Sequence, residues 1–259
     1  MKIRLFIGLL TIFATTSIAQ TSAKVANVYD VTKSPYNADA SGATASDVAI
    51  QKAINAAAAA GSWGTVIYFP TGTYILNNPL FIGTGIAGSP QTGGMIFEGE
   101  SREKTNINVR SRTAFSFLGR DCNTTDYTTW YGNSTYHNEI KNLTINKITS
   151  STTLSGGCAI DLLHANGTLI DNVTIRAYSS CSFDCGIRAM MDYLTVTNCN
   201  IEVPGGSIDT GISIDFNKSI SFNNSIGSFF AVPTDGARVG FTHIAGCGIG
   251  VYAHGRARV

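Results

Sequence analysis

A short pattern of apolar and polar residues recurs along the second half of the chain. Each copy has an isoleucine after a small residue, with a Cys or Thr two positions before the isoleucine. The four isoleucines of the pattern are Ile160, Ile187, Ile212 and Ile249. A second pattern, a hydroxyl residue between two apolar ones, lies between these copies at Thr144, Thr174, Thr195 and Ser221. Successive copies are 21 to 37 residues apart, a spacing typical of solenoids and propellers.

Each repeat unit predicts two short β-strands, because apolar and polar residues alternate within it and Gly, Asn and Asp residues separate the strands. One such unit cannot bury its apolar face alone, whereas stacked units bury a continuous core. We therefore predict an all-β protein, a right-handed parallel β-helix, with the four isoleucines stacked in its interior.

A single helix is predicted before the repeats. Ser46 is suited to cap a helix that runs from Asp47 to about Ala60, and Gly61 is suited to end it in a left-handed conformation. The apolar stripe of this helix is formed by Ile50, Ala53, Ile54 and Ala57. Since an open solenoid end exposes strand edges and core, the helix is expected to cover the first coil.

The chain divides into three parts. Residues 1–19 have the basic start, apolar middle and small-x-small ending of a signal peptide, so we expect cleavage near Ala19 and a secreted, periplasmic or extracellular product. Residues 20–45 form a lead segment, and residues 46–259 form the β-helix domain. No recognisable cap follows the last repeat. We therefore expect a missing segment or an oligomer partner at the C-terminal end of the solenoid.

Composition and charge exclude several kinds of partner. Charged residues make up 14% of the chain and the formal net charge is +1, so charge alone recruits neither nucleic acid nor a membrane surface. No His accompanies the cysteines at metal-ligand spacing, so no metal site is predicted. The low charge content and the many Gly and Asn residues suit stacked strands joined by polar turns.

The six cysteines all follow the expected signal peptide. In an oxidising compartment they can form disulfides, but the count allows many pairings. Cys158 and Cys185 each stand two positions before a repeat isoleucine, so we expect them to share its inward face, about 4.8 Å apart on adjacent strands. An inter-coil disulfide and a ladder of buried free thiols both fit this spacing.

The predicted helix and the strands after it contain motifs in a recognisable order: helix, strand, Pro-x-Gly-x-Tyr turn and Gly-x-Gly-like turn. The residues that carry this order are Asp47, Ala49–Ile54, Gly64–Pro70, Gly72–Tyr74 and Phe97–Glu100. The stretch from residue 47 to about residue 109 resembles the opening of the pectate-lyase-like superfamily. More narrowly, it is similar to the branch of rhamnogalacturonase-type and polygalacturonase-related proteins and phage tailspikes. The resemblance implies the β-helix fold; its members include hydrolases, lyases, epimerases and binders.

The resemblance does not carry over a complete catalytic set. The polygalacturonase-type pattern has Asn-Thr-Asp, a paired Asp-Asp, Gly-His-Gly and Arg-x-Lys. This chain has partial matches at Thr234-Asp235-Gly236, Ala253-His254-Gly255 and Arg256-Ala257-Arg258. Gly246-Cys247-Gly248 stands where the Asp pair would fall. These matches do not establish a hydrolase.

Candidate catalytic residues come from outward positions and from turns. The position after each repeat isoleucine places Asp161 beside Arg188, either as an acid next to a charge that lowers its pKa or as a solvated ion pair of little energy. Carboxylates in turns are further candidates, although a turn Asp usually bonds its own backbone. The candidates are therefore Asp161, Arg188, Asp184, Asp215 and Asp235.

Candidate binding residues lie on the least repetitive stretch, from Asp121 to His137, and on the strands after it. Aromatic side chains there can stack on sugar rings, and a nearby arginine can hold a sugar carboxylate. The candidates are Trp130, Tyr131, Tyr127 and Arg176. We expect the stretch to adjoin one outward face that carries Asp161, Arg188 and Arg176. The alternative is a lid packed over a simple ion pair.

Two functions fit these observations. The first is a secreted protein that cleaves a pectin-like or other acidic glycan, by glycoside hydrolysis or by β-elimination. It would need no cofactor, except that a lyase could use Ca²⁺ to neutralise the sugar carboxylate. The second is a non-catalytic β-helical module that binds carbohydrate or sits on a surface. In both cases the expected partner is a polysaccharide.

Overall fold

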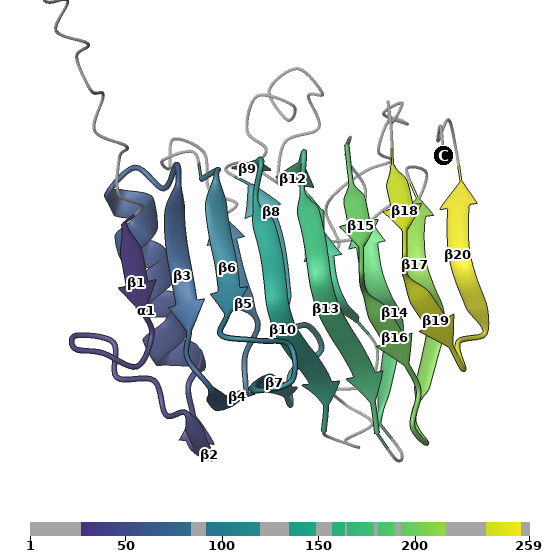
Figure 1. Ribbon diagram of the computed structural model, residues 1–259, viewed down its shortest axis with the longest axis horizontal. Helices are drawn as coiled ribbons and strands as arrows, with labels where there is room; N and C mark the ends of the chain where they lie inside the picture. The colour runs from purple at the N-terminus through teal and green to yellow at the C-terminus, as the bar shows by residue number, and fades with distance from the viewer. Residues whose placement is uncertain are drawn as a thin grey trace, which may run out of the picture.

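The computed structural model of the protein is a stack of parallel β-strands with one helix at its N-terminal end (Figure 1). It describes residues 27–83, 92–119, 135–148, 157–163, 165–178, 181–189, 193–215 and 237–254. Every pairing between its named strands is parallel. The predicted all-β parallel β-helix is therefore confirmed.

Two large sheets form the walls of the solenoid. The strands of sheet A are β1 (Val28–Asp30), β2 (Ser41–Ala45), β3 (Thr65–Phe69), β4 (Gly72–Leu76), β6 (Met95–Gly99), β7 (Thr105–Val109), β10 (Glu139–Lys147), β13 (Leu169–Ala177), β15 (Thr195–Thr197), β16 (Asn200–Glu202), β18 (Arg238–Gly240) and β19 (His243–Ala245). The strands of sheet B are β5 (Leu80–Gly83), β8 (Phe115–Gly119), β11 (Cys158–Leu162), β14 (Ser182–Ala189), β17 (Ser207–Asp215) and β20 (Ile249–His254). A small third sheet pairs β9 (Thr135–Tyr136) with β12 (Ala165–Asn166).

Sheet A bends in the middle of its coils, and in three successive coils asparagine stands at the bend. Asn142, Asn172 and Asn198 stack at this position with φ angles of 59°, 53° and 54°. Asn adopts this left-handed conformation more readily than most residues. The side chain of Asn172 also donates a 2.8 Å hydrogen bond to the side chain of Asn142. The bend turns each coil toward sheet B without breaking the pairing on either side of it.

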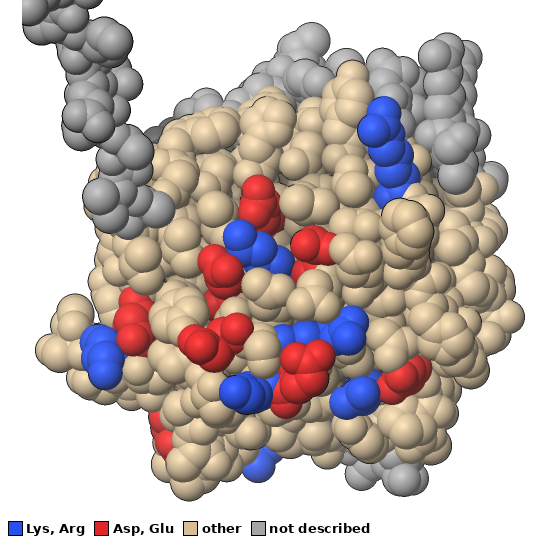
Figure 2. Space-filling view, in the orientation of Figure 1, with Lys and Arg blue, Asp and Glu red and all other residues tan. Residues whose placement is uncertain are grey.

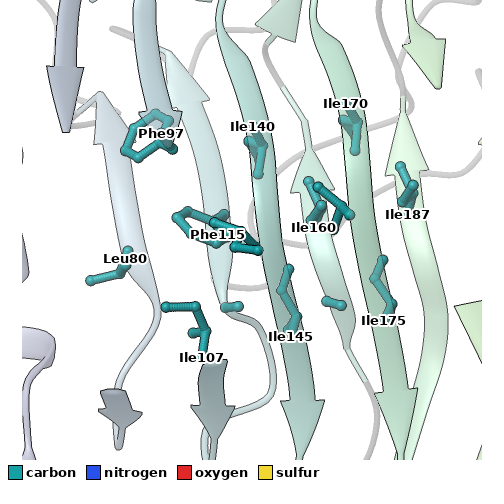
Figure 3. Packing of buried hydrophobic residues seen from close by; sticks show 14 of the residues in the cluster. Leu80, Phe97, Ile107, Phe115, Ile140, Ile145, Ile160, Ile170, Ile175 and Ile187 are labelled. Atoms are coloured by element: carbon teal, nitrogen blue, oxygen red, sulfur yellow. The ribbon is translucent and has the colours of Figure 1, made fainter. Parts of the chain in front are cut away.

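Apolar side chains from both sheets stack in columns inside the solenoid (Figure 3). In sheet A, Ile140 pairs with Ile170 and Ile145 pairs with Ile175. The columns of the two sheets face each other across the interior, and their isoleucines are almost fully buried. Burial of a side chain of this size contributes roughly 1.5–3 kcal/mol, so the stacked columns supply the main apolar stabilisation.

Three of the four predicted core isoleucines lie in one column of sheet B. Ile160 pairs with Ile187, Ile187 pairs with Ile212, and all three are fully buried. The prediction for the fourth is wrong, because Ile249 pairs with Thr210 and is 48% exposed, while Val251 takes the place opposite Ile212. Ile249 thus continues the column of Cys185 and Thr210 instead of the isoleucine column, because the last copy is shifted by two residues in the pairing.

The second repeat pattern also shifts in its third copy. Thr144 pairs with Thr174 as predicted, but Thr195 pairs with Leu169, and Asn200 is the residue opposite Thr174. The reason is the position of the bend: it falls at Asn198, after the third copy, instead of just before it. Ser221 lies outside the described residues.

The helix α1 (Asp47–Ala59) covers the N-terminal end of the stack (Figure 1). Its predicted apolar stripe is buried, and Gly61 has the expected positive φ of 95°. The predicted side-chain cap is wrong, because the Ser46 hydroxyl donates instead to the carbonyl of Asp39. No helix within the described ranges is long and apolar enough to cross a membrane.

One glutamine of α1 completes the edge of sheet B. The backbone N–H of Phe81, in the edge strand β5, donates to Gln51 Oε1 at 2.8 Å, and Gln51 Nε2 donates to the Phe81 carbonyl at 2.9 Å. The amide side chain thus makes the two bonds that a neighbouring strand would make. An edge strand with free backbone groups is a template for aggregation, and Gln51 occupies two of these groups.

A lysine lies inside the solenoid. Lys147 follows the inward alternation of β10, stacks between Val109 and Ala177, and is fully buried. Its ammonium group donates to the carbonyl of Ser111 and lies 5.3 Å from the centre of the Phe183 ring. Burial lowers the pKa of Lys147 to about 8, because removal from water disfavours the charged form.

We predict that Lys147→Met makes the protein less sensitive to pH. The pKa of Lys147 is about 8 in the fold, below the ordinary lysine value of 10.5. The free energy of unfolding of the wild type should therefore rise between these two pH values, by up to about 3 kcal/mol, because the unfolded chain keeps the proton that the folded chain has lost. The free energy of unfolding of the variant relative to the wild type should therefore fall by most of that amount between pH 7 and pH 10 in denaturant titrations. A difference that stays constant would contradict this.

We also predict that Gln51→Leu promotes self-association. The substitution keeps a helix-forming side chain but frees the backbone groups of Phe81, at a cost of about 1 kcal/mol in the free energy of unfolding. Light scattering during mild heating should show earlier aggregation than in the wild type. Lys52→Leu is the matched control, because it adds the same apolar side chain to the next position of α1. Equal aggregation of both variants would show that surface apolarity, and not the sheet edge, is the cause.

Candidate functional site

The outward face of sheet B carries one continuous column of residues, which we call the Asp161 column. The members pair with one another from coil to coil and alternate with core residues; they are Phe81, Ser116, Asp161, Arg188, Ser213 and Tyr252. Aromatic side chains stand at its two ends, with Phe81 41% and Tyr252 38% exposed. The column therefore places polar groups between two aromatic surfaces.

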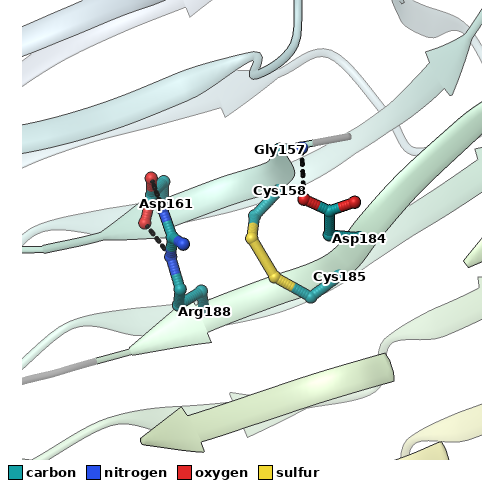
Figure 4. Close-up of a disulfide and its surroundings, with 6 residues drawn as sticks. All are labelled: Gly157, Cys158, Asp161, Asp184, Cys185 and Arg188. Carbon is teal, nitrogen blue, oxygen red and sulfur yellow. Dashed lines mark hydrogen bonds and ion pairs between the residues drawn. A yellow bond between two sulfur atoms is a disulfide. The ribbon is translucent and has the colours of Figure 1, made fainter. Parts of the chain in front are cut away.

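Asp161 and Arg188 form a two-pronged ion pair at the centre of this column (Figure 4). Arg188 Nε donates to Asp161 Oδ1 at 2.8 Å, and Nη2 donates to Oδ2. The side chain of Asp161 is only 7% exposed and that of Arg188 is 22% exposed. The predicted juxtaposition is confirmed, but the alternative of a solvated surface pair is wrong.

Burial has the larger effect on the acidity of Asp161. It raises the pKa of the carboxyl group, while the hydrogen bonds and charge of Arg188 act in the opposite direction. The expected net lowering by Arg188 is therefore not what the structure shows. A carboxyl group with a raised pKa can take up or give a proton closer to neutral pH than an ordinary Asp.

A disulfide joins the same two strands beside the ion pair. Cys158 and Cys185 are bonded, with their Cα atoms 4.6 Å apart, which settles the choice between a disulfide and free thiols. Both are buried, but neither belongs to the apolar core cluster, which includes Ala159 and the isoleucines next to them. The prediction that they share the inward face is therefore wrong. The inward place is taken by the residue that follows each cysteine: a Cβ on Gly186 would lie 3.3 Å from Ile201.

The other catalytic candidates are less well placed. Asp184 is exposed and accepts a 2.9 Å hydrogen bond from the backbone N–H of Gly157, on the other side of the disulfide from Asp161 (Figure 4). Asp215 ends β17, and its backbone pairs with that of His254. Asp235, Trp130, Tyr131 and Tyr127 lie outside the described residues, so their roles stay predictions.

Arg176 lies on the other sheet. It belongs to β13 in sheet A, whereas Arg188 belongs to β14 in sheet B. The expectation of one face carrying Asp161, Arg188 and Arg176 is therefore wrong, because consecutive strands of a coil belong to different walls of the solenoid. On sheet A, Arg176 Nε donates to Glu202 Oε2 at 2.9 Å. This hydrogen bond is the largest cause of a lowered pKa of Glu202.

Charged side chains gather across the outward face of sheet A (Figure 2). A hollow of about 300 Å³ lies among them, next to Arg176. The residues that line it with Arg176 are Arg102, Glu103, Asn106, Thr144, Thr174 and Asn200. Sequence reasoning missed Arg102, Asn106 and Asn200. Asn200 could have been found only by placing the bend of its coil at Asn198.

No metal site is apparent within the described ranges. No group of three or more His, Cys, Asp or Glu side chains there is close enough to hold an ion. The use of Ca²⁺ by a lyase therefore has no candidate ligand group in these ranges and stays a prediction.

Several solved structures are similar to this chain at low sequence identity. ORF18 of Geobacillus virus E2 is 15% identical, with a TM-score of 0.49, over 83% of this chain and 48% of its own. The A-module of the Azotobacter vinelandii mannuronan C-5 epimerase AlgE4 is 16% identical, with a TM-score of 0.39, over 72% and 53%. An iota-carrageenase complexed to iota-carrageenan fragments is 12% identical, with a TM-score of 0.36, over 80% and 61%. The chain thus spans about half the length of the first two.

A protein-family model matches most of the chain. No curated protein sequence matches the chain. The model described as rhamnogalacturonase A/epimerase, pectate lyase-like, however, matches residues 28–250. This range begins at β1 and reaches β20, so it includes the helix, both walls of the solenoid and the Asp161 column up to Ser213. The chain therefore belongs to the rhamnogalacturonase A/epimerase, pectate lyase-like family.

Proposed function

We propose that the protein binds an acidic polysaccharide along the outward face of sheet B and cleaves it, with Asp161 as the proton-transferring group and Arg188 as the group that holds a sugar carboxylate. The observation that carries this proposal is the buried two-pronged pair of Asp161 and Arg188 at an outward position. Membership of a family named for polysaccharide-active proteins supports the substrate class. A solenoid wall also offers a long surface to a long ligand.

Of the two cleavage reactions, β-elimination fits the described residues better, because it needs one base and one cation, whereas hydrolysis needs two carboxyl groups at a fixed separation. Hydrolysis needs two carboxyl groups about 5–5.5 Å or about 6.5–9.5 Å apart, and Asp184 is held by a backbone N–H beyond the disulfide. In β-elimination one base takes the C5 proton of a uronate, a C4–C5 double bond forms, the C4–O bond breaks, and the protonated base returns the proton to the departing oxygen. A cation next to the sugar carboxylate stabilises the charge that develops. Asp161 supplies the base and Arg188 the cation.

We further propose that the protein acts outside the cytoplasm. The Cys158–Cys185 disulfide supports this, because disulfides persist in oxidising compartments and are rare in the cytosol. The predicted signal peptide, residues 1–19, lies outside the described residues and stays a prediction.

The second candidate function is non-catalytic binding of the same glycans. It is favoured by the complete pairing of the Asp161 carboxylate, since both of its oxygens accept from Arg188. A buried ion pair of this kind can have a purely structural role, in which it fixes the register of two coils. Turnover, not affinity, separates the two candidates.

We predict that neutral replacement of the pair abolishes cleavage without unfolding the protein. Arg188→Met alone leaves a buried carboxylate unpaired, which costs about 3–5 kcal/mol, whereas Asp161→Leu with Arg188→Met replaces the pair by apolar groups and is tolerated. Wild type and variants are incubated with polygalacturonate, rhamnogalacturonan, mannuronan and iota-carrageenan, and both reducing ends and unsaturated uronates are measured. The double variant should melt near the wild-type temperature but lose at least about 100-fold in rate.

The control for this experiment is Asp171→Asn on sheet A, which removes a partly exposed carboxylate that accepts a hydrogen bond from Asn198. It should leave turnover unchanged. Wild-type turnover in the double variant would show that the pair is structural. Binding of a glycan without any turnover in the wild type would establish the non-catalytic function.

The pH dependence of kcat/KM should identify the reaction. Burial raises the pKa of Asp161. As the base of an elimination it must be ionised, so activity should fall as pH drops through this raised pKa; as the acid of a hydrolysis it must be protonated, and activity should fall as pH rises. We expect the first profile. Asp161→Glu should move the acidic limb, and a limb that does not move would assign it to another group.

A further inference from the structure

The hollow on sheet A is formed by side chains from several coils and is separate from the Asp161 column. Its floor is formed by the in-register outward residues Asn106, Thr144, Thr174 and Asn200, which come from four successive coils. Arg102 and Arg176 stand at its sides. Its volume of about 300 Å³ is at the lower end of the range for small-molecule sites.

The wall made by Arg102 is fixed before any ligand arrives. Thr144 Oγ1 donates to the Arg102 carbonyl at 2.7 Å, and Arg102 Nη1 donates to the Asn198 carbonyl at 3.2 Å. These two bonds tie the turn before β7 to β10 and to the bend between β15 and β16. A preformed wall avoids the entropy cost of ordering side chains on binding.

Two amide oxygens in and beside the hollow have no protein donor among the described residues. Asn200 Nδ2 donates to Glu202, which turns Asn200 Oδ1 away from that carboxylate, and Oδ1 is buried and unpaired. Asn146 is 7% exposed; its amide nitrogen donates to Asn106 and Asn108, and its oxygen is likewise unpaired. Buried acceptors of this kind call for a hydroxyl or amide donor.

The charges around the hollow cancel. Arg176 is paired with Glu202 at 2.9 Å, and Arg102 lies 3.4 Å from Glu103. The hollow therefore has no net attraction for an anion, but it presents arginine donors and carboxylate and amide acceptors side by side. Adjacent ring hydroxyls, each both donor and acceptor, match such a surface.

We infer that this hollow binds one pyranose unit of a glycan through its hydroxyl groups, whether the unit is neutral or acidic. Ring hydroxyls donate to Asn200 Oδ1 and accept from Arg102 and Arg176. The site holds the glycan on a different wall of the solenoid from the Asp161 column, so it adds a second point of attachment. It does not depend on the cleavage reaction proposed above.

The test compares matched variants with a matched pair of probes. Trigalacturonate and its methyl ester have the same ring hydroxyls but differ in charge, and their binding is measured by calorimetry. Thr174→Val removes a hydroxyl from the floor, and Asn200→Ala removes the unpaired oxygen. Thr197→Val is the control, because Thr197 is on the same face of sheet A but pairs with Asp171 and Gly240, away from the hollow.

We expect both probes to bind the wild type within about 3-fold of each other, and Thr174→Val and Asn200→Ala each to weaken both by about 2- to 10-fold. Thr197→Val should change neither. Binding should survive in the Asp161→Leu/Arg188→Met variant, whatever its turnover. The inference is overturned if neither probe binds, if only the free acid binds, or if binding is lost in the double variant and unaffected by Thr174→Val and Asn200→Ala.

Discussion

The register between successive coils is the constraint on which the other features depend. β10 and β13 pair at eight positions on the two sides of one bend, so an inserted or deleted residue within a strand would move its inward side chains to the outer face. Length variation is therefore confined to the turns. The same register that stacks Ile160 on Ile187 also sets Asp161 beside Arg188. The register that stacks the core residues therefore also aligns the outward residues. No further interaction is needed to bring neighbouring outward groups together.

The ion pairs on the two walls lie in different electrostatic environments. On sheet B the ion pair is almost withdrawn from water, so burial dominates and the pKa of Asp161 rises. On sheet A, Arg176 and Glu202 are each about one-third exposed, so water screens this pair and its contribution to stability is small. A reactive group suits the first environment and reversible sugar binding suits the second. The Arg176–Glu202 and Asp161–Arg188 pairs each join adjacent coils, across 26 and 27 residues of sequence, and they differ in burial.

The sequence predicts the fold well because the repeats encode it directly. The inward isoleucines, the apolar stripe of the helix and the cysteine pair all follow from periodicity. Periodicity fails at Ile249, because a shift of two residues in the pairing sets it opposite Thr210 instead of Ile212. It also fails where a bend moves along the chain, as at Asn198, which gives Thr195 a different partner. Arg176 and Arg188 are twelve residues apart by number, yet the coil carries them to different walls. The hollow could not be predicted from the repeats, because Arg102 lies in a turn and does not occupy a repeat position.

The disulfide has a mechanical consequence. A solenoid held by contacts between neighbouring coils unravels from its ends, one coil after another, when it is pulled. The Cys158–Cys185 bond closes a ring across a sequence separation of 27 residues. Tension then bypasses the enclosed coil, and the fully extended chain is shorter by about 90 Å. Strands β11 and β14 stay side by side under load, and the ion pair between them lies in the part of the wall that the disulfide holds together.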